Sequence, residues 1–291
     1  MQIIGTGLSG LVGSRIVELN PQHQFIDLSL DTGHDILKME TLEETFKNNL
    51  GDIVLHLAAF TDTNAAWNQK GDKDGLCYQL NVVGTQNIVS LCQKYGKYLI
   101  HISTDFVFDG TKETPYNEED TPNPLDWYGQ TKYEAERVVL SFQNNSSIIR
   151  IALPYRSFFP NKTDAARKII TKLQNNEIVT MFTDQIITPT FIDDVAFGIS
   201  KIIDKKPTGI YHLVGSSSQS PFDMAQKIAE VLGFNRNLII PSSLIKYLKT
   251  PNVRPYAIND ALSNQKFISE FGFIPKTLTE GLEEMKKQLN I

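Results

Sequence analysis

The chain opens with a strand, a glycine-rich turn and a helix, and this order constrains the fold more than any other feature. An apolar run at residues 2–5 leads into Gly7, Gly10 and Gly13, before a helical pattern at residues 15–19. Such glycines permit a tight turn, the approach of a pyrophosphate and close packing of the helix on the sheet. The amides at the helix start also suit phosphates. We therefore predict a doubly wound, Rossmann-type α/β fold that binds a dinucleotide through Gly7, Gly10, Leu11, Val12 and Gly13.

An acidic residue ends the second expected strand, at residues 24–27. Asp27 follows the first glycine of the turn by twenty residues, where a carboxylate accepts hydrogen bonds from ribose hydroxyls and repels a 2′-phosphate. No basic residue follows among residues 28–31. Asp27 therefore favours NADH over NADPH, and the alternative is that it only caps a loop. Asp35 and Ile36 are candidates to lie near the adenine, unless Asp35 is simply a loop residue.

A nearly unbroken apolar run at residues 52–59 predicts a parallel strand buried on both faces. The small residues Ala58 and Ala59 at its end leave room for a flat cofactor, and Thr61 opens the following loop. A long helix is expected at residues 76–95. Its Asn81 is a cofactor-side candidate that either faces solvent or holds a water in the active site.

The stretch Tyr128-Gly129-Gln130-Thr131-Lys132 places a phenol and an ammonium about one helical turn apart. An ammonium favours the phenolate, so we expect Lys132 to lower the pKa of Tyr128 and make it a proton donor and acceptor near neutral pH. The strand expected at residues 98–105 ends in Thr104 and Asp105, where hydroxyls point at the crevice that binds ligands in α/β folds. In isolation, the alternative for this motif is an exposed aromatic beside a solvated lysine.

Composition narrows the class of protein. The net charge of −5 argues against non-specific binding to nucleic acid or anionic membranes. No apolar run approaches the length of a membrane span, and no cleavable leader is recognisable, so a cytoplasmic location is expected. The two cysteines, Cys77 and Cys92, belong to no metal-ligand pattern and are expected to be reduced core residues, so we predict no metal site.

Taken together, these motifs resemble the extended short-chain dehydrogenases/reductases. The block at residues 101–110 (HISTDFVFDG), Tyr128-Gly129 with Lys132, and Arg254-Pro255 are similar to the dTDP-4-dehydrorhamnose reductase branch. The resemblance covers nearly the whole chain. It implies NAD(P)H-dependent reduction of the 4-keto group of a nucleotide-activated deoxysugar, as in dTDP-rhamnose and polysaccharide biosynthesis. Tyr128 would supply the proton, and Lys132 would bind the nicotinamide ribose. Thr104 would bond the carbonyl oxygen, and Asp105 would orient the sugar or take part in the proton relay.

Some residues depart from the family pattern. Leu11-Val12 stand where relatives usually carry Gln-Leu, and residues 151–162 lack the usual glycine-rich turn. These departures affect cofactor preference and the identity of the sugar more than the reaction type. The candidates for the substrate side are Thr104, Asp105, Phe106, Tyr155, Arg156, Asn161 and Arg254; amide and guanidinium groups suit a diphosphate. The alternative for Arg156, Asn161 and Arg254 is a surface polar residue.

No clear linker divides the chain. We expect a dinucleotide-binding domain at residues 1–154, with strands from about 178–215 returning to it, and a smaller α/β substrate-binding domain at residues 155–291. Two other functions stay open: a sugar-nucleotide epimerase on the same fold, and a non-catalytic dinucleotide-binding subunit resembling the β-subunit of methionine adenosyltransferase. The sequence leaves open which sugar and nucleotide bind and whether the chain forms a homodimer.

Overall fold

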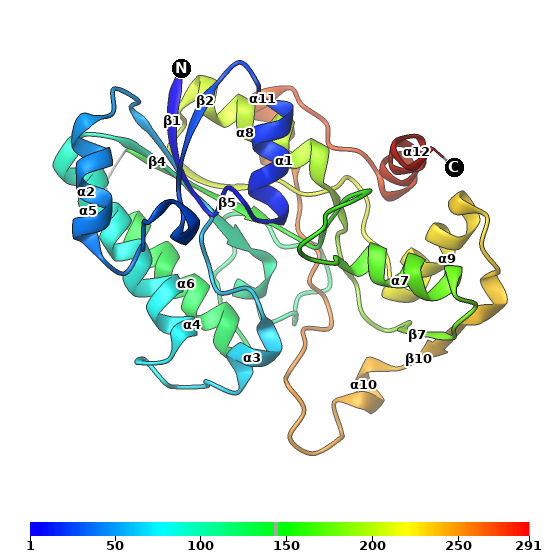
Figure 1. Cartoon of the computed structure of the whole chain (residues 1–291). Coiled ribbons are helices and arrows are strands. Elements are labelled where there is room, and N and C mark those ends of the chain that lie inside the picture. Colours follow the sequence, from blue (N-terminus) through cyan, green and yellow to red (C-terminus); the bar gives the residue numbers. More distant parts are fainter. Residues whose placement is uncertain (143–144, 291) are drawn as a thin grey trace.

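A six-stranded parallel sheet forms the centre of the computed structural model, which describes residues 1–142 and 145–290 (Figure 1). The strand order is β2-β1-β3-β4-β5-β9. The strands are β1 (Gln2–Thr6), β2 (Gln24–Leu28), β3 (Ile53–His56), β4 (Tyr98–Thr104), β5 (Ser146–Ile151) and β9 (Gly209–His212). Strands β3, β4 and β5 are buried at every residue, as a parallel sheet covered on both faces requires. The predicted Rossmann-type fold is confirmed.

Helices cover both faces of this sheet. One face packs against α1 (Leu11–Leu19), α8 (Ile192–Lys205) and α11 (Gln265–Phe271). The other face packs against α2 (Met39–Asn48), α5 (Gly84–Tyr95) and α6 (Trp127–Leu140). The neighbouring residues Ile3 and Ile4 of β1 belong to these two separate cores, because successive side chains of a strand point to opposite faces.

A second lobe lies to one side of the sheet, with its own core (Figure 1). It contains the parallel pair β7 (Val179–Phe182) and β10 (Ile239–Ser242), with α7 (Ala165–Gln174), α9 (Pro221–Leu232) and α12 (Leu278–Leu289). Local sequence defines these helices well. In α9, for example, Ser220 Oγ accepts a hydrogen bond from the amide of Asp223, and Gly233 ends the helix in the left-handed conformation.

The return of the chain to the main sheet differs in part from the expectation for residues 178–215. Strand β9 joins the main sheet, but β7 pairs with β10 in the second lobe. Strand β7 buries Val179 and exposes Thr180, so it has only one apolar face and suits a small sheet rather than the doubly covered one. The division into domains at residues 1–154 and 155–291 stays a prediction.

Shorter elements complete the chain. They are β6 (Pro154–Tyr155) paired with β8 (Thr190–Phe191), α3 (Thr63–Trp67), α4 (Leu76–Tyr78), α10 (Leu244–Tyr247), a π-helix at Gln79–Val83, and 3₁₀ turns at Leu30–Thr32, Asp105–Val107 and Arg236–Leu238. Within the described ranges, no helix is long and apolar enough to cross a membrane.

A fully buried ion pair joins α6 to β5. The Arg150 guanidinium donates to both carboxylate oxygens of Glu136, at 2.9 and 2.7 Å, and both side chains are about 1% exposed. Arg150 also contacts Nε2 of His212 and lies over the ring of Phe108. The pair holds α6 against the centre of the sheet.

Replacing Glu136 by Gln tests this pair. The change leaves a buried guanidinium without its counter-charge, which typically costs about 3 kcal/mol or more of unfolding free energy. Urea unfolding measures the loss. As a matched control, Glu230→Gln removes the exposed partner of Lys227 on α9 and should leave stability nearly unchanged. Equal effects of the two changes would contradict a structural role for the buried pair.

Candidate active site

The glycine-rich turn lies between β1 and α1, beside the end of β3. At this point the strand order reverses, which is where α/β sheets bind ligands. Gly7 has φ +69°, and a Cβ there would lie 2.7 Å from the amide nitrogen of Ala58. A Cβ on Gly13 would lie 2.4 Å from the carbonyl oxygen of Gly7. Both positions therefore require glycine.

The start of α1 has amides available for an anion. Its N-cap, Gly10, has no side chain to cap the first turn, and that turn carries no acidic residue. Leu11 and Val12 follow at the first helical positions and are half-buried. A dinucleotide's pyrophosphate fits this cradle of small residues and helix amides.

Asp27 has a free acceptor beside the turn. Its Oδ2 accepts a hydrogen bond from Ser29 Oγ at 3.0 Å, while its buried Oδ1 has no partner within the described protein. A ribose hydroxyl matches such an acceptor. Asp35 instead uses Oδ1 to accept from the amide of Leu37, which stabilises a local turn, and Ile36 is buried.

The other residues predicted to contact the cofactor lie in the loop after β3 and in the π-helical segment. Ala58 and Ala59 are half-buried, and the exposed Thr61 accepts a hydrogen bond from Lys162 Nζ of the second lobe at 2.7 Å. Asn81 is 1% exposed and lies in the π-helical segment. Its Nδ2 donates to Thr131 Oγ1 at 2.9 Å, and its Oδ1 accepts from the amide of Phe60 at 2.7 Å. Of the two alternatives for Asn81, the solvent-facing one is contradicted, because the side chain is buried and ties the β3 loop to α6.

Tyr128 and Lys132 lie in the first turns of α6, next to the end of β4. Tyr128 is 9% exposed, and its phenol interacts with the hydroxyl of Thr104, whose Oγ1 donates to Asp105 Oδ1 at 2.8 Å. Lys132 Nζ donates to the carbonyl oxygen of Ile102 at 2.8 Å and contacts His101 Nε2. The phenol, the hydroxyl and the amine are thus gathered at one strand end.

The effect expected of Lys132 on Tyr128 was wrong. Burial raises the pKa of Tyr128, and the negative charge of Asp105 raises it further, while the Thr104 hydrogen bond opposes this rise. Burial also lowers the pKa of Lys132 to about 8, and the charge that remains near neutral pH does not offset the rise at Tyr128. Tyr128 therefore stays a protonated phenol, the form that a proton donor needs.

Phe106 and Arg254 lie next to this group. The ring of Phe106 meets that of Tyr128 edge-on at 5.4 Å, and the Arg254 guanidinium lies over the rings of Phe106 and Tyr256. Arg254 Nη1 also donates to Asp126 Oδ2 at 2.6 Å. Arg254 is therefore no free surface residue, because Asp126 already neutralises its charge.

The remaining substrate candidates are spread over the second lobe. Tyr155 is 1% exposed and packs against Phe191 in the core of that lobe, so its ring is not presented to a ligand. Arg156 is also buried, and its guanidinium bonds Glu18, Ser14 and the carbonyl oxygen of Leu11 on α1. These contacts replace the expected diphosphate contact. Asn161 is exposed, next to Lys162.

Comparison with known protein families identifies the family of this chain. The family model described as "RmlD substrate binding domain" matches residues 1–291. The chain belongs to the RmlD substrate binding domain family. The resemblance expected from the motifs is therefore confirmed.

The proteins similar to this chain include reductases and a subunit of another enzyme. The "Probable low-salt glycan biosynthesis reductase Agl14" of Haloferax volcanii is 28% identical, over 97% of this chain and 96% of that protein. The solved structure of dTDP-4-dehydrorhamnose reductase from Bacillus anthracis in complex with NADP is 26% identical, with a TM-score of 0.88 over 99% of both chains. Methionine adenosyltransferase 2 subunit beta of Bos taurus is 28% identical, over 84% of this chain and 74% of that protein.

Reasoning from sequence missed three polar residues of this RmlD-family site. Asp126 is the N-cap of α6, and its Oδ1 accepts from the amide of Gly129 at 2.8 Å. Asp260 accepts from Gln185 Nε2 at 3.2 Å, and the charge of Asp105 is close enough to raise its pKa. A signal existed for Asp126, an acid just before a helix, but none existed for Asp260 or Gln185. No group of three or more potential metal ligands occurs in the described part of the chain.

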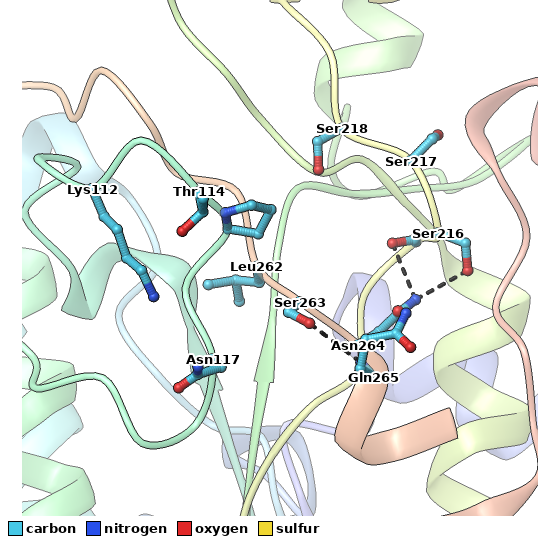
Figure 2. Close-up of a pocket in the computed structure, with 12 residues that line it drawn as sticks. Lys112, Thr114, Asn117, Ser216, Ser217, Ser218, Leu262, Ser263, Asn264 and Gln265 are labelled. Carbon is cyan, nitrogen blue, oxygen red and sulfur yellow. Dashed lines mark hydrogen bonds between the residues drawn. The ribbon is translucent and has the colours of Figure 1, made fainter. Parts of the chain in front are cut away.

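A separate polar cavity lies beyond the β9 end of the sheet (Figure 2). Its volume is about 340 Å³, and its lining includes Lys112, Thr114, Asn117, Ser216, Ser218 and Asn264. Its polar groups mostly bond one another or the backbone: Asn264 Nδ2 donates to Ser216 Oγ, and Ser218 pairs with Thr188. The cavity therefore has no donor set directed at a ligand.

Lys132 gives the fold a testable pH dependence. Its pKa in the folded protein is about 8, against an ordinary value of 10.5, because burial disfavours the ammonium. Between these two pH values the unfolded chain binds a proton that the folded chain has lost, so stability should rise with pH. The rise amounts to at most about 3 kcal/mol.

Urea unfolding of the wild type and of Lys132→Met across this pH range measures the effect. The stability of the wild type relative to the variant should increase from pH 8 to pH 10.5. Parallel curves for the two proteins would show that the folded lysine keeps its ordinary pKa.

Proposed function

We propose that the protein is an NAD(P)H-dependent reductase that acts on the 4-keto group of a nucleotide-activated deoxysugar. The observation that carries the proposal is the meeting of Tyr128, Thr104 and Lys132 at the end of β4, with Tyr128 held as a protonated phenol. A reductase must protonate the alkoxide that forms when hydride reaches the carbonyl carbon, and a neutral phenol at that point is suited to do so.

Gly7, Gly10, Gly13 and Asp27 would hold the dinucleotide, whose nicotinamide supplies the hydride. Tyr128 donates its proton to the carbonyl oxygen, and the Thr104 hydroxyl stabilises the phenolate left behind. The Ile102 carbonyl holds the Lys132 amine beside β4, and there it would bind a hydroxyl of the nicotinamide ribose. A direct bond from Thr104 to the carbonyl oxygen, contacts of Asp105 and Phe106 with the sugar, and contact of Asn161 with the diphosphate stay predictions of this proposal. The relatives named as reductases support the reaction type.

The second candidate is a non-catalytic dinucleotide-binding subunit. The similarity to methionine adenosyltransferase 2 subunit beta favours it. The two candidates differ in one measurement, the oxidation of NADH or NADPH in the presence of dTDP-4-keto-6-deoxysugars. Binding of the dinucleotide without oxidation, across a panel of sugar nucleotides, would support the subunit.

Tyr128→Phe tests the role of the phenol. The variant lacks the proton donor but keeps the ring, so we expect unchanged cofactor affinity and a loss in kcat of about 10²- to 10⁴-fold. Tyr133→Phe, on the same helix, is the matched control and should retain full activity. Turnover by Tyr128→Phe at the wild-type rate would rule out Tyr128 as the proton donor.

Asp27→Ala tests cofactor choice. Loss of the carboxylate should weaken the binding of NADH more than that of NADPH, because only NADH presents a free adenosine 2′-hydroxyl to Asp27. Fluorescence titration with both cofactors gives the two dissociation constants, with Asp31→Ala as a nearby exposed control. The relative solved with NADP makes this comparison informative. Equal weakening of both cofactors would argue against a ribose contact.

A further inference from the structure

The loop at residues 156–164, between β6 and α7, is closed at its base and fixed to α1. Asp164 Oδ2 accepts a hydrogen bond from the amide of Arg156 at 3.2 Å, and Asp164 Oδ1 caps α7. The Arg156 guanidinium then bonds the first turn of α1, at the carbonyl oxygen of Leu11 and at Ser14 Oγ. This loop, green beside α1 in Figure 1, is therefore held at one end by both lobes.

The other end of the loop reaches the segment that follows β3. Lys162 Nζ donates to Thr61 Oγ1 at 2.7 Å, and both residues are exposed. Thr61 comes shortly after Ala58, whose backbone lies against Gly7 of the glycine-rich turn. The loop therefore contacts the main lobe on both sides of that turn, at the start of α1 and after β3.

The segment that Lys162 contacts also borders the phenol. Phe60, the residue before Thr61, packs against the buried cluster that contains Tyr128. The amide of Phe60 donates to Asn81 Oδ1 at 2.7 Å, which fixes the segment in place. Lys162 is thus bonded to a segment that lies between the turn expected to hold the dinucleotide and the phenol expected to face the substrate.

Lys162 differs in charge balance from the two arginines first considered for a diphosphate. Arg156 pairs with Glu18, and Arg254 pairs with Asp126, so the protein itself neutralises both guanidinium groups. In the described part of the chain no ion pair includes Lys162, and its amine bonds a neutral hydroxyl. Its charge is therefore available to an anionic ligand.

One acid, Asp62, lies close enough for its charge to act on Lys162. Burial lowers the pKa of Lys162, and the charge of Asp62 opposes this fall. Asp62 Oδ1, however, is the N-cap acceptor of α3 and receives the amides of Asn64 and Ala65. Asp62 is therefore engaged by its own helix and does not take the place of a contacting counter-ion.

We propose that Lys162 binds the diphosphate of a ligand and gives up its bond to Thr61 when that ligand enters. The proposal rests on the reductase function above, whose dinucleotide and sugar nucleotide each carry a diphosphate. A lysine ammonium binds phosphate as a compact point charge. The exchange is favourable because a diphosphate offers full negative charge where the threonine hydroxyl offers only a dipole.

The two cations of the loop then have different roles. Arg156 is buried, and its bonds to α1 hold the base of the loop in place. Lys162 is exposed and bonded through one hydroxyl, so its amine is free to move to a ligand without disturbing that base. Lys162 is a binding residue that touches no reacting atom, and its loss should act on affinity rather than on the chemical step.

Lys162→Gln is the first test, because it removes the charge and keeps a donor for Thr61. The probes are NADH, NADPH and dTDP, each titrated separately. We expect the dissociation constant of the probe whose diphosphate Lys162 contacts to rise about tenfold, with an unchanged urea midpoint. Lys162→Arg keeps the charge and should retain most of the affinity. Lys168→Gln, an exposed site on α7 whose charge also acts on Lys162, is the matched control.

The salt dependence of binding gives a second measurement that a structural role of Lys162 would not change. Added salt should weaken binding to the wild type more than binding to Lys162→Gln, because screening acts on the charge that the variant lacks. Parallel salt dependence in the two proteins would contradict a contact between the ammonium and the diphosphate.

The outcomes identify the source of the diphosphate. Weaker binding of NADH and NADPH alone assigns Lys162 to the dinucleotide, and weaker binding of dTDP alone assigns it to the sugar nucleotide. Unchanged dissociation constants for all three probes, or equal losses in Lys162→Gln and Lys168→Gln, overturn the proposal. A wild type that binds the probes but reduces no keto-sugar nucleotide overturns the proposed reaction, while the titrations still decide the role of Lys162. A wild type that binds none of the probes overturns both.

Discussion

The bond from Lys132 Nζ to the carbonyl oxygen of Ile102 joins α6 to β4 at the candidate active site. It holds α6 across the end of β4, so that Tyr128, at the start of the helix, meets Thr104, at the end of the strand. The amine is 3% exposed, and burial lowers its pKa. Keeping a lysine in this place costs stability, and the neighbouring contacts of the helix offset that cost.

Those contacts form a continuous buried polar network. Thr6, just before the glycine turn, bonds His56, which bonds Thr85, and the Thr85 hydroxyl donates to the carbonyl oxygen of Asn81. Asn81 then bonds Thr131 on α6. Because buried polar groups are expensive to leave unpaired, the network admits few alternative arrangements. The turn that suits a dinucleotide and the helix that carries the phenol are therefore positioned relative to each other before any ligand arrives.

The sequence predicted the parts of the site that short patterns define. Gly7 and Gly13 occupy positions where a Cβ would clash, and the four-residue spacing of Tyr128 and Lys132 placed both on one helix. Spacing does not reveal burial, however, and burial with the Asp105 charge reversed the expected shift in the Tyr128 pKa. Asp260 and Gln185 were missed because contacts between segments about 75 residues apart in the sequence place them. Tyr155 was a candidate for the substrate side, although its ring packs in a core that sequence position does not reveal.

The hydrogen bonds of Arg156 to α1 restrain motion between the second lobe and the main sheet. Its guanidinium reaches from the second lobe to Leu11, Ser14 and Glu18 with four hydrogen bonds. Swinging the lobes apart at this edge would strip a buried cation of its partners, which is costly. The two lobes are therefore held together at the edge where the second lobe meets α1.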